Sequence, residues 1–489
     1  MKAIVKIIRN AVLLALAAMA IFVGVRIYDT ERGPALQLWH THVPEELDRD
    51  ALDRADWATY LAAEDRVFAD VESNVSNALP AEARTASDRY FADSPLHPAR
   101  FARDWNRSFI LEPAGEPKGA AVFLHGLTDS PYSMRTLARL YQDRGFVAIV
   151  IRLPGHGTVP AGLTEVEWED WLAASRLAIR EARRRVGPDK PLHLIGYSNG
   201  GALAVKCALD ALDDDRQVGP LPRADQIILI SPMIGITAFA RFAGLAALPA
   251  FLPAFAKAAW LSIVPEINPF KYNSFPVNGA RQAHRLTRVL QQQIAARAQR
   301  GSRGTLDGLP PILTFQSVED FTVDTRALVS SLYSQLPANG SELVLFDLNR
   351  AAALSPLLRR DADLRVSLLL PPSPRRYRTV VLTNAGADTL QMSERVVEAG
   401  ETAEASRPLD MTYPADIFSL SHVALPFPPS DPLYGFAPDD AEDFGIRLGT
   451  VASRGEIGVL LVSLDTLMRI NSNPFFAYLS DRVAGTIPP

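Results

Sequence analysis

One short segment of the chain has residue types and spacing that could perform nucleophilic chemistry. An apolar run, Leu192–Ile195, leads into the sequence GYSNG at residues 196–200, and a helix-forming stretch, Ala202–Leu209, follows. A G-x-S-x-G pattern between a strand and a helix is typical of a nucleophile elbow, which holds a serine hydroxyl out at the carboxyl end of the strand. Glycines are needed at both flanks because a Cβ there would clash with the neighbouring backbone. Ser198 is therefore the predicted nucleophile.

A serine nucleophile needs a general base, and two histidines follow Ser198 in the chain. In folds with this elbow the order along the chain is serine, acid, histidine. His284 lies within an amphipathic helical stretch, where we expect a solvated side chain. His422 follows an apolar segment and precedes a proline-containing loop. A base that must reach both the serine and the leaving group belongs on such a loop, so His422 is the predicted base.

The acid that orients this imidazole is expected just after the next core strand. Ile312–Gln316 has the pattern of that strand, and Asp320 follows it closely. Asp320 is the predicted acid, which would fix the tautomer of the histidine and stabilise its cation. Three other carboxylates remain alternatives: Glu319, Asp324 and, more distantly, Asp347.

Two backbone N–H groups are expected to bind the oxyanion that forms during acyl transfer. One belongs to the residue after the nucleophile, Asn199, and the other to a loop that follows an earlier strand. Ala120–Leu124 is that strand, and Gly126 after it would let the backbone turn so that the Leu127 N–H faces the site. Two histidines in loops before the serine are expected to shape those loops: His125 and His156.

These groups can meet only if a sheet brings distant segments to one edge. From residue 108 onward, short apolar runs alternate with helix-like stretches. This alternation predicts an α/β fold with a mostly parallel central sheet and helices on both faces. The predicted strands are Ser108–Leu111, Ala120–Leu124, Val147–Ile151, Leu192–Ile195, Gln226–Ile230 and Ile312–Phe315, with helices near 134–143, 168–185 and 201–212.

Composition changes along the chain divide it into segments. The predicted segments are a membrane anchor or signal segment (1–29), a helical lead-in (30–104), a first core part (105–236), a helical cap (237–308) and a second core part (309–489) that carries an insert at 339–415. The first half of the cap segment is very apolar. Helices with so much apolar surface must cover something, so we expect a cap over the site. The role of the insert stays open.

The N-terminus predicts a membrane location. Lys2, Lys6 and Arg9 precede an uncharged apolar run at 10–25, a charge pattern that places the N-terminus in the cytoplasm and the remainder on the non-cytoplasmic side. Ala18–Ala20 could be a signal-peptidase site, but the apolar run continues beyond it. An uncleaved anchor is therefore favoured over a cleaved signal peptide with secretion, and a buried core helix is the remaining alternative.

The bulk composition excludes several function classes. The chain has 489 residues, 48% of them hydrophobic, so it can bury a sizeable core. A formal net charge of −5 without a long basic stripe gives no electrostatic reason to bind nucleic acid. The single cysteine, Cys207, cannot form an intramolecular disulfide, and no Cys–His cluster suggests a zinc site. We expect no metal or other cofactor, and the oligomeric state stays open.

Taken together, five motifs resemble those of the carboxylesterase and monoacylglycerol-lipase branch of the α/β hydrolases, often grouped with the serine aminopeptidases. The motifs are HGLTDSPYS (125–133), RLPGHG (152–157), GYSNGG (196–201), VEDFTV (318–323) and SH (421–422). The resemblance spans roughly 105–335 and the surroundings of His422. It implies an α/β-hydrolase fold and ester hydrolysis through an acyl-serine, with Ser198, Asp320 and His422 as triad and Leu127 and Asn199 as oxyanion donors.

One departure from the family pattern concerns the unusually long interval between Asp320 and His422, which predicts that the last strands of the sheet are extended or rewired. The expected function is hydrolysis of a small hydrophobic ester or a lipid near a membrane. One alternative is a peptidase, amidase or acyltransferase with the same triad, for which the cap offers only Glu266, with Asp307 at its margin, to hold a substrate amine. Another is a membrane-tethered, non-catalytic binding module. Dehalogenase chemistry is not expected, because an aspartate would then stand at the elbow.

Overall fold

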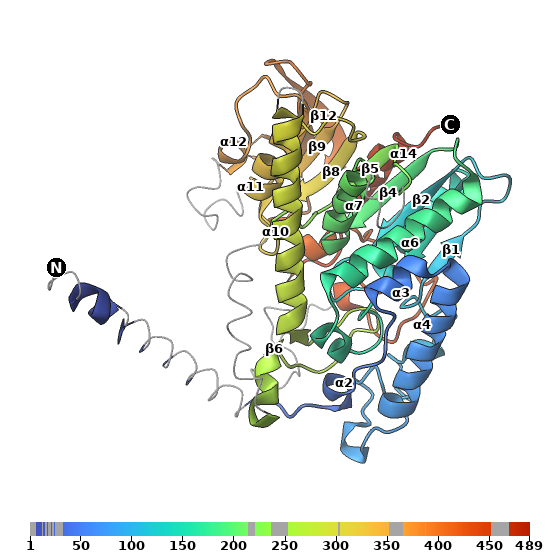
Figure 1. The fold of residues 1–489 in the computed structure, drawn as a ribbon. Helices are drawn as coiled ribbons and strands as arrows, with labels where there is room; N and C mark the ends of the chain where they lie inside the picture. Colours follow the sequence, from blue (N-terminus) through green and yellow to red (C-terminus); the bar gives the residue numbers. More distant parts are fainter. Residues whose placement is uncertain are drawn as a thin grey trace.

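A ten-stranded sheet forms the centre of the protein. The computed structural model describes residues 33–213, 221–235, 253–301, 304–351, 365–386, 388–450 and 469–489, together with scattered positions between 6 and 24. The strand order is β1-β3-β2-β4-β5-β8-β9-β10-β11-β12 (Figure 1). The strands are β1 Phe109–Leu111, β2 Gly119–Leu124, β3 Phe146–Ile151, β4 Leu192–Tyr197, β5 Gln226–Ile230, β8 Ile312–Ser317, β9 Glu342–Phe346, β10 Arg378–Gly386, β11 Thr389–Val397 and β12 Glu404–Thr412.

The sheet is mostly parallel, as predicted. All neighbouring pairs from β3 through β10 are parallel, whereas β1, β11 and β12 pair antiparallel with their neighbours. Every residue of β2 is buried, as expected for a strand covered on both faces. Its side chains alternate between the two core clusters, since Val122 and Leu124 belong to one and Ala121 and Phe123 to the other.

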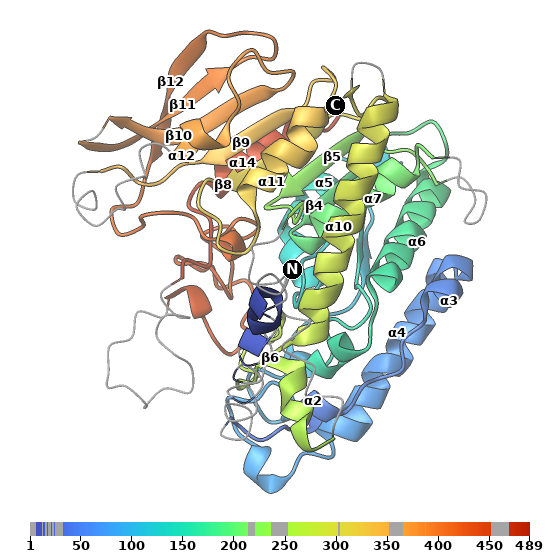
Figure 2. The same cartoon turned by 60° about the vertical axis from the view of Figure 1, so that its left-hand side comes forward.

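Helices cover both faces of the sheet. One face carries α6 (Trp168–Val186), α7 (Asn199–Asp210) and α10 (Val277–Arg300), and the lead-in helix α3 (Arg49–Arg54) packs on α6 (Figures 1 and 2). The core cluster of the other face contains residues of α5 (Arg135–Asp143) and α14 (Phe476–Ala484), which contact each other. This two-sided cover confirms the layered α/β arrangement.

The predicted strands form, with ends that differ by at most two residues. The sheet extends beyond them, which confirms the prediction that its last strands are extended. The segment 339–415 contains β9, β10, β11 and β12, which lengthen the central sheet at one end (Figure 2). These strands occupy the long interval between Asp320 and His422. β12 is the last strand, and most of its residues are exposed.

The segment predicted as a cap contains two different parts. Its C-terminal part includes α10, which packs against α6 and α7 and so belongs to the layer that covers the sheet. The described part before it includes the short helix Pro253–Ala259 and a two-stranded sheet of β6 (Trp260–Ser262) and β7 (Phe275–Pro276). The apolar stretch 236–252 lies outside the described residues, so the expectation of a helical cap there stays a prediction.

The predicted N-terminal membrane segment, 1–29, also lies mostly outside the described residues. Within the part of the chain that the structure describes, no helix is both long and apolar enough to cross a bilayer. The membrane anchor therefore stays a prediction.

A buried arginine joins the lead-in to the core. The Arg152 guanidinium, just after β3, donates to both Glu46 oxygens at 2.7 and 2.9 Å and to Glu64 Oε1 at 3.1 Å. Glu64 lies on α4 (Trp57–Val71), where the Tyr60 hydroxyl donates to the Arg152 carbonyl at 2.5 Å. Arg152 is fully buried. The lead-in is therefore an integral part of the folded unit.

Replacing Arg152 with methionine is expected to lower the free energy of unfolding by about 3–5 kcal/mol, because it leaves two carboxylates without their cation in the interior. Urea denaturation followed by circular dichroism measures the change. As a control, Arg49→Met removes an exposed arginine of the same lead-in that pairs with Asp50, and we expect it to leave the stability nearly unchanged. Equal losses for the two variants would show that the buried network contributes little.

Candidate active site

Ser198 lies in a strained turn between β4 and α7. Its backbone has φ 54° and ψ −115°, a conformation that is unusual for a residue with a Cβ. Hydrogen bonds to neighbouring strand ends hold it there, because the Ser198 N–H donates to Ile230 and the Ser198 carbonyl accepts from Met233. A Cβ on Gly196 would lie 2.3 Å from the Gly200 carbonyl oxygen, and a Cβ on Gly200 would lie 2.0 Å from that of Leu124. Both flanking glycines are thus required by close backbone contacts.

A continuous chain of hydrogen bonds links Ser198, His422 and Asp320. His422 Nε2 lies 2.9 Å from Ser198 Oγ, and His422 Nδ1 lies 2.9 Å from Asp320 Oδ2. An ionised carboxylate can only accept, which assigns the proton on the imidazole to Nδ1 and leaves Nε2 free to accept the serine proton. The structure therefore brings together three residues that are up to 224 positions apart in the sequence.

The loop that carries His422 is fixed to the sheet. Ser317, the last residue of β8, donates from its Oγ to the Leu420 carbonyl at 2.9 Å. The Ser421 hydroxyl donates to the Ile470 carbonyl. The ring of Tyr197 lies 5.5 Å from the imidazole, centroid to centroid. These contacts hold the imidazole in reach of the serine.

The surroundings of Asp320 favour its ionised form. Burial alone would raise its pKa, but the adjacent His422 and the N–H groups of Val323 and Thr322 hold the pKa below its usual value. Those two N–H groups donate to Oδ1 at 3.0 and 2.8 Å. The carboxylate can therefore stay negative beside the imidazole and stabilise the positive charge that forms on it.

The other candidate acids have different partners. Asp324 accepts from two N–H groups at the start of the short helix Thr325–Ala327. Asp347 accepts from the Arg350 guanidinium and the Thr383 hydroxyl. The imidazole of His422 uses its two nitrogens for Asp320 and Ser198, which leaves no ring nitrogen for Glu319. The geometry thus selects Asp320 among the four carboxylates.

The two loop histidines considered from the sequence, His125 and His156, have hydrogen-bond partners other than Ser198. His125 Nε2 accepts from the Leu153 N–H at 3.0 Å, and its Nδ1 donates to the Gly126 carbonyl. His156 Nδ1 donates to the Pro154 carbonyl, and burial lowers its pKa to about 4. His284 lies on α10. The two loop histidines therefore bond to backbone, as expected for residues that shape loops.

The two predicted oxyanion donors flank the nucleophile. Asn199 is the first residue of α7, and Leu127 lines the same cavity as Ser198. Gly126 lets this loop approach closely, because a Cβ there would lie 3.2 Å from the Ser198 Cβ. Neither the Leu127 N–H nor the Asn199 N–H donates a hydrogen bond to a described residue, so both are available to a ligand. Their role as donors stays a prediction.

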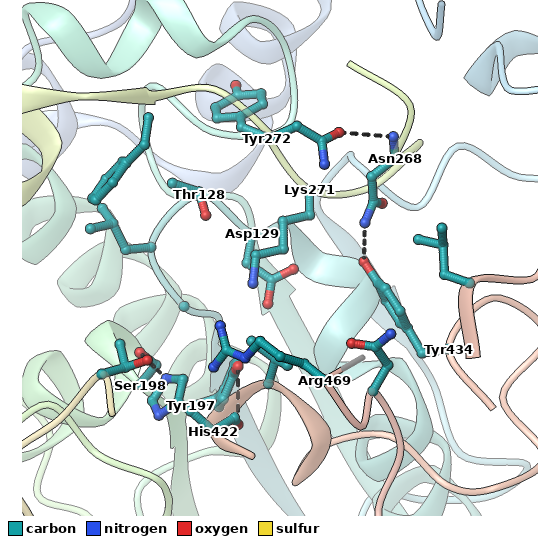
Figure 3. A pocket seen from close by; sticks show the side chains of 18 of the residues that line it. Thr128, Asp129, Tyr197, Ser198, Asn268, Lys271, Tyr272, His422, Tyr434 and Arg469 are labelled. Carbon is teal, nitrogen blue, oxygen red and sulfur yellow. Dashed lines mark hydrogen bonds between the residues drawn. The ribbon is translucent and has the colours of Figure 1, made fainter. Parts of the chain in front are cut away.

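The serine opens into a cavity of about 430 Å³. Apolar side chains form part of its wall, among them Leu127, Met233, Phe275 and Phe427. Charged and polar side chains form the remainder, and Figure 3 shows Asp129, Lys271 and Arg469 near the centre of this view, with Asn268 and Tyr434 to one side. The cavity is therefore amphipathic.

Residues 121–399 match the sequence profile of a family described as the alpha/beta hydrolase family. This match covers more than half of the chain. The chain belongs to the α/β hydrolase family. Its strand–elbow–helix segment and mostly parallel sheet agree with that assignment.

Individual relatives of this α/β hydrolase are distant. A thermostable monoacylglycerol lipase from Bacillus sp. (strain H-257) is 31% identical over 87 residues, which are 18% of this chain and 34% of that protein. The chain thus aligns with about a third of that relative's length. A structure reported with two metagenome-derived lipolytic enzymes is 22% identical and covers 50% of this chain and 88% of its own, with a TM-score of 0.38. The Paleococcus ferrophilus monoacylglycerol lipase is 14% identical and covers 49% and 86%, with a TM-score of 0.35.

Two charged residues in the cavity of this hydrolase were not predicted from the sequence motifs. Lys271 lies in the segment between β6 and β7, and Arg469 comes from the C-terminal region. Neither belongs to a motif or follows a core strand directly. The one local signal for Lys271 was its position among three aromatic residues in the sequence NPFKYNSF (268–275).

Proposed function

We propose that this α/β hydrolase cleaves carboxylic esters through an acyl-serine intermediate. The observation that carries the proposal is the hydrogen-bonded chain from Ser198 Oγ through His422 to Asp320, with both distances at 2.9 Å. The Bacillus relative named as a thermostable monoacylglycerol lipase supports an ester as the substrate class. The apolar part of the cavity wall supports a substrate with a hydrophobic portion.

In the acylation step, Ser198 Oγ attacks the ester carbonyl carbon while its proton moves to His422 Nε2. The carbonyl oxygen becomes an oxyanion that accepts hydrogen bonds from the Leu127 and Asn199 N–H groups. One such donor contributes about 2.7–4 kcal/mol to transition-state stabilisation. When the tetrahedral intermediate collapses, the bond to the alcohol oxygen breaks and the alcohol leaves with the proton from His422. Asp320 stabilises the imidazolium throughout.

In the deacylation step, water takes the place of the alcohol. His422 accepts one proton from water, and the resulting hydroxide attacks the acyl-serine carbonyl. The same two N–H groups bind the second oxyanion. Collapse breaks the bond to Ser198 Oγ, which regains its proton from His422, and the carboxylic acid leaves.

The cavity suits an ester substrate better than a peptide substrate whose free amine must be bound by a carboxylate. Glu266, the one cap carboxylate that the peptidase alternative offered for binding an amine, is buried and accepts from the backbone N–H groups of Asn273 and Ser274 at 2.9 and 2.7 Å. Burial raises its pKa to about 7, which weakens its negative charge near neutrality. It does not line the cavity. Among the described lining residues, Asp129 is the sole carboxylate, and it has Lys271 as a charged neighbour (Figure 3).

A fluorophosphonate probe tests the proposal, because it forms a covalent bond only with an activated serine. We expect stoichiometric labelling of the full chain and, after proteolysis, mass-spectrometric localisation of the adduct to Ser198. In parallel, 4-nitrophenyl butyrate and the matched 4-nitroanilide separate ester from amide cleavage. Absence of labelling would refute an activated nucleophile, and faster cleavage of the anilide would favour the amidase alternative.

The N-terminal segment supports a second, separate proposal on location, namely that residues 1–29 anchor the hydrolase in a membrane with its catalytic region on the non-cytoplasmic side. The basic residues before the apolar run support this orientation. Alkaline carbonate extraction of membranes from cells that express the full chain is expected to leave the protein in the pellet. Release of a shortened protein into the medium would instead indicate a cleaved signal peptide.

A further inference from the structure

Two cationic side chains share the cavity with the nucleophile. Lys271 reaches it from the segment between β6 and β7, and Arg469 reaches it from the C-terminal region (Figure 3). The Tyr272 N–H donates to the Thr128 carbonyl at 2.8 Å, which fixes the segment of Lys271 against the loop that carries Leu127. Lys271 is therefore held close to the predicted oxyanion donors.

Among the described residues, the charges that line the cavity do not balance. His422 is bonded to Asp320, which leaves Asp129 as the one negative group facing Lys271 and Arg469 among the described lining residues. Neither cation forms an ion pair or a hydrogen bond with a described residue through its side chain. Burial lowers the pKa of Lys271, Asp129 opposes this effect, and Arg469 adds to it. The two cations therefore lie close enough to repel each other.

An anionic ligand group would relieve this imbalance. A partly buried ammonium without a hydrogen-bonded counter-ion is costly, and a bound anion offsets that cost. Burial also raises the pKa of Asp129 to about 6, so that its compensating charge is weaker than that of an ordinary aspartate. Lysine and arginine bind carboxylates and phosphates through short charge-assisted hydrogen bonds.

We propose that the preferred ester carries an anionic group, a carboxylate or a phosphate, which Lys271 and Arg469 bind while the ester carbonyl lies at Ser198. This proposal rests on the proposed ester hydrolysis and narrows its substrate class. The apolar wall at Leu127, Phe275 and Phe427 contacts the hydrocarbon part of the same molecule. Lys271 and Arg469 are thus specificity-determining residues.

Two matched substrate pairs test the proposal and locate the anion. The first pair is mono-(4-nitrophenyl) glutarate and neutral 4-nitrophenyl pentanoate, which differ by a carboxylate on the acyl side. The second is a 1-acylglycerol 3-phosphate and the 1-acylglycerol with the same chain, which differ by a phosphate on the alcohol side. We expect the kcat/KM ratio of charged to neutral ester to exceed one in at least one pair. Ratios below one in both pairs would overturn the proposal.

The Lys271→Met variant is expected to lower that ratio by about tenfold or more, because it removes a charge-assisted hydrogen bond. Lys271→Arg is expected to retain most of the preference. The control, Lys118→Met, replaces an exposed lysine outside this cavity and should leave the ratio unchanged. An unchanged ratio in Lys271→Met would also overturn the proposal.

The proposed ester hydrolysis can fail independently of this specificity. If the neutral esters are cleaved and Ser198 is labelled, but neither pair shows a preference for the charged member, only the anion proposal is wrong. If no ester of either pair is cleaved and Ser198 is not labelled, the hydrolase function itself is wrong. Circular dichroism and thermal unfolding of Lys271→Met, compared with the wild-type protein, check that the variant is folded.

Discussion

Replacing Ser198 with alanine is expected to lower kcat for ester hydrolysis by about 10⁶-fold, the loss found when the nucleophile of a serine triad is removed. The variant keeps the cavity and both predicted backbone donors, so substrate should still bind. Steady-state hydrolysis of 4-nitrophenyl butyrate measures the loss, and circular dichroism checks the fold.

The matched control for this experiment is Ser175→Ala. Ser175 is also buried, but it lies on α6, and its hydroxyl donates to the Trp171 carbonyl at 2.8 Å. We expect wild-type kcat from this control. If Ser198→Ala retained wild-type turnover, the acyl-serine mechanism would be excluded, since no other residue occupies the elbow.

The second large effect is expected from Asp320→Asn, which should lower kcat by about 10⁴-fold, as losing the correct imidazole tautomer does in serine triads. An amide in place of the carboxylate can donate to Nδ1, which moves the ring proton to Nε2 and blocks acceptance of the serine proton. It also removes the negative charge that stabilises the imidazolium. The kcat for a neutral ester measures the effect, and KM should change little.

Two comparisons make the Asp320 prediction specific. Asp324→Asn changes a carboxylate that caps a short helix, and Asp347→Asn changes one that accepts from Arg350. Both should reduce kcat far less than Asp320→Asn does. A larger loss in either variant would reassign the acid. Combining Ser198→Ala with Asp320→Asn should add almost no further loss, because triad residues act as a unit.

The central strands and the elbow could be predicted from sequence because their signals are local. Buried parallel strands consist of short apolar runs. The glycines of GYSNG are required because a Cβ at either position would clash with neighbouring backbone atoms. Chain order then ranked the candidate acids and bases. This is why Asp320 and His422 could be chosen before the structure brought them within hydrogen-bond distance of each other.

The remaining features depend on contacts between distant segments. Nothing local in 339–415 indicates that β9 adds to the edge of β8, since the neighbour of a strand is set by the whole sheet. The amphipathic pattern of α10 predicts that one face of the helix is buried. It does not predict which layer of the fold that face packs against. Lys271 and Arg469 lie about 200 residues apart in sequence, so their meeting in one cavity was not predictable from local patterns.

The exposed terminal strand, β12, affects how the molecule behaves in a crowded solution. An open sheet edge offers unpaired backbone groups to any other extended chain, and natural proteins protect such edges with charges and prolines. β12 contains Glu404, Arg407, Asp410 and, within its length, Pro408, which has no N–H to donate. The charged residues and the proline of β12 therefore protect the edge of the extended sheet against pairing with other copies of the chain.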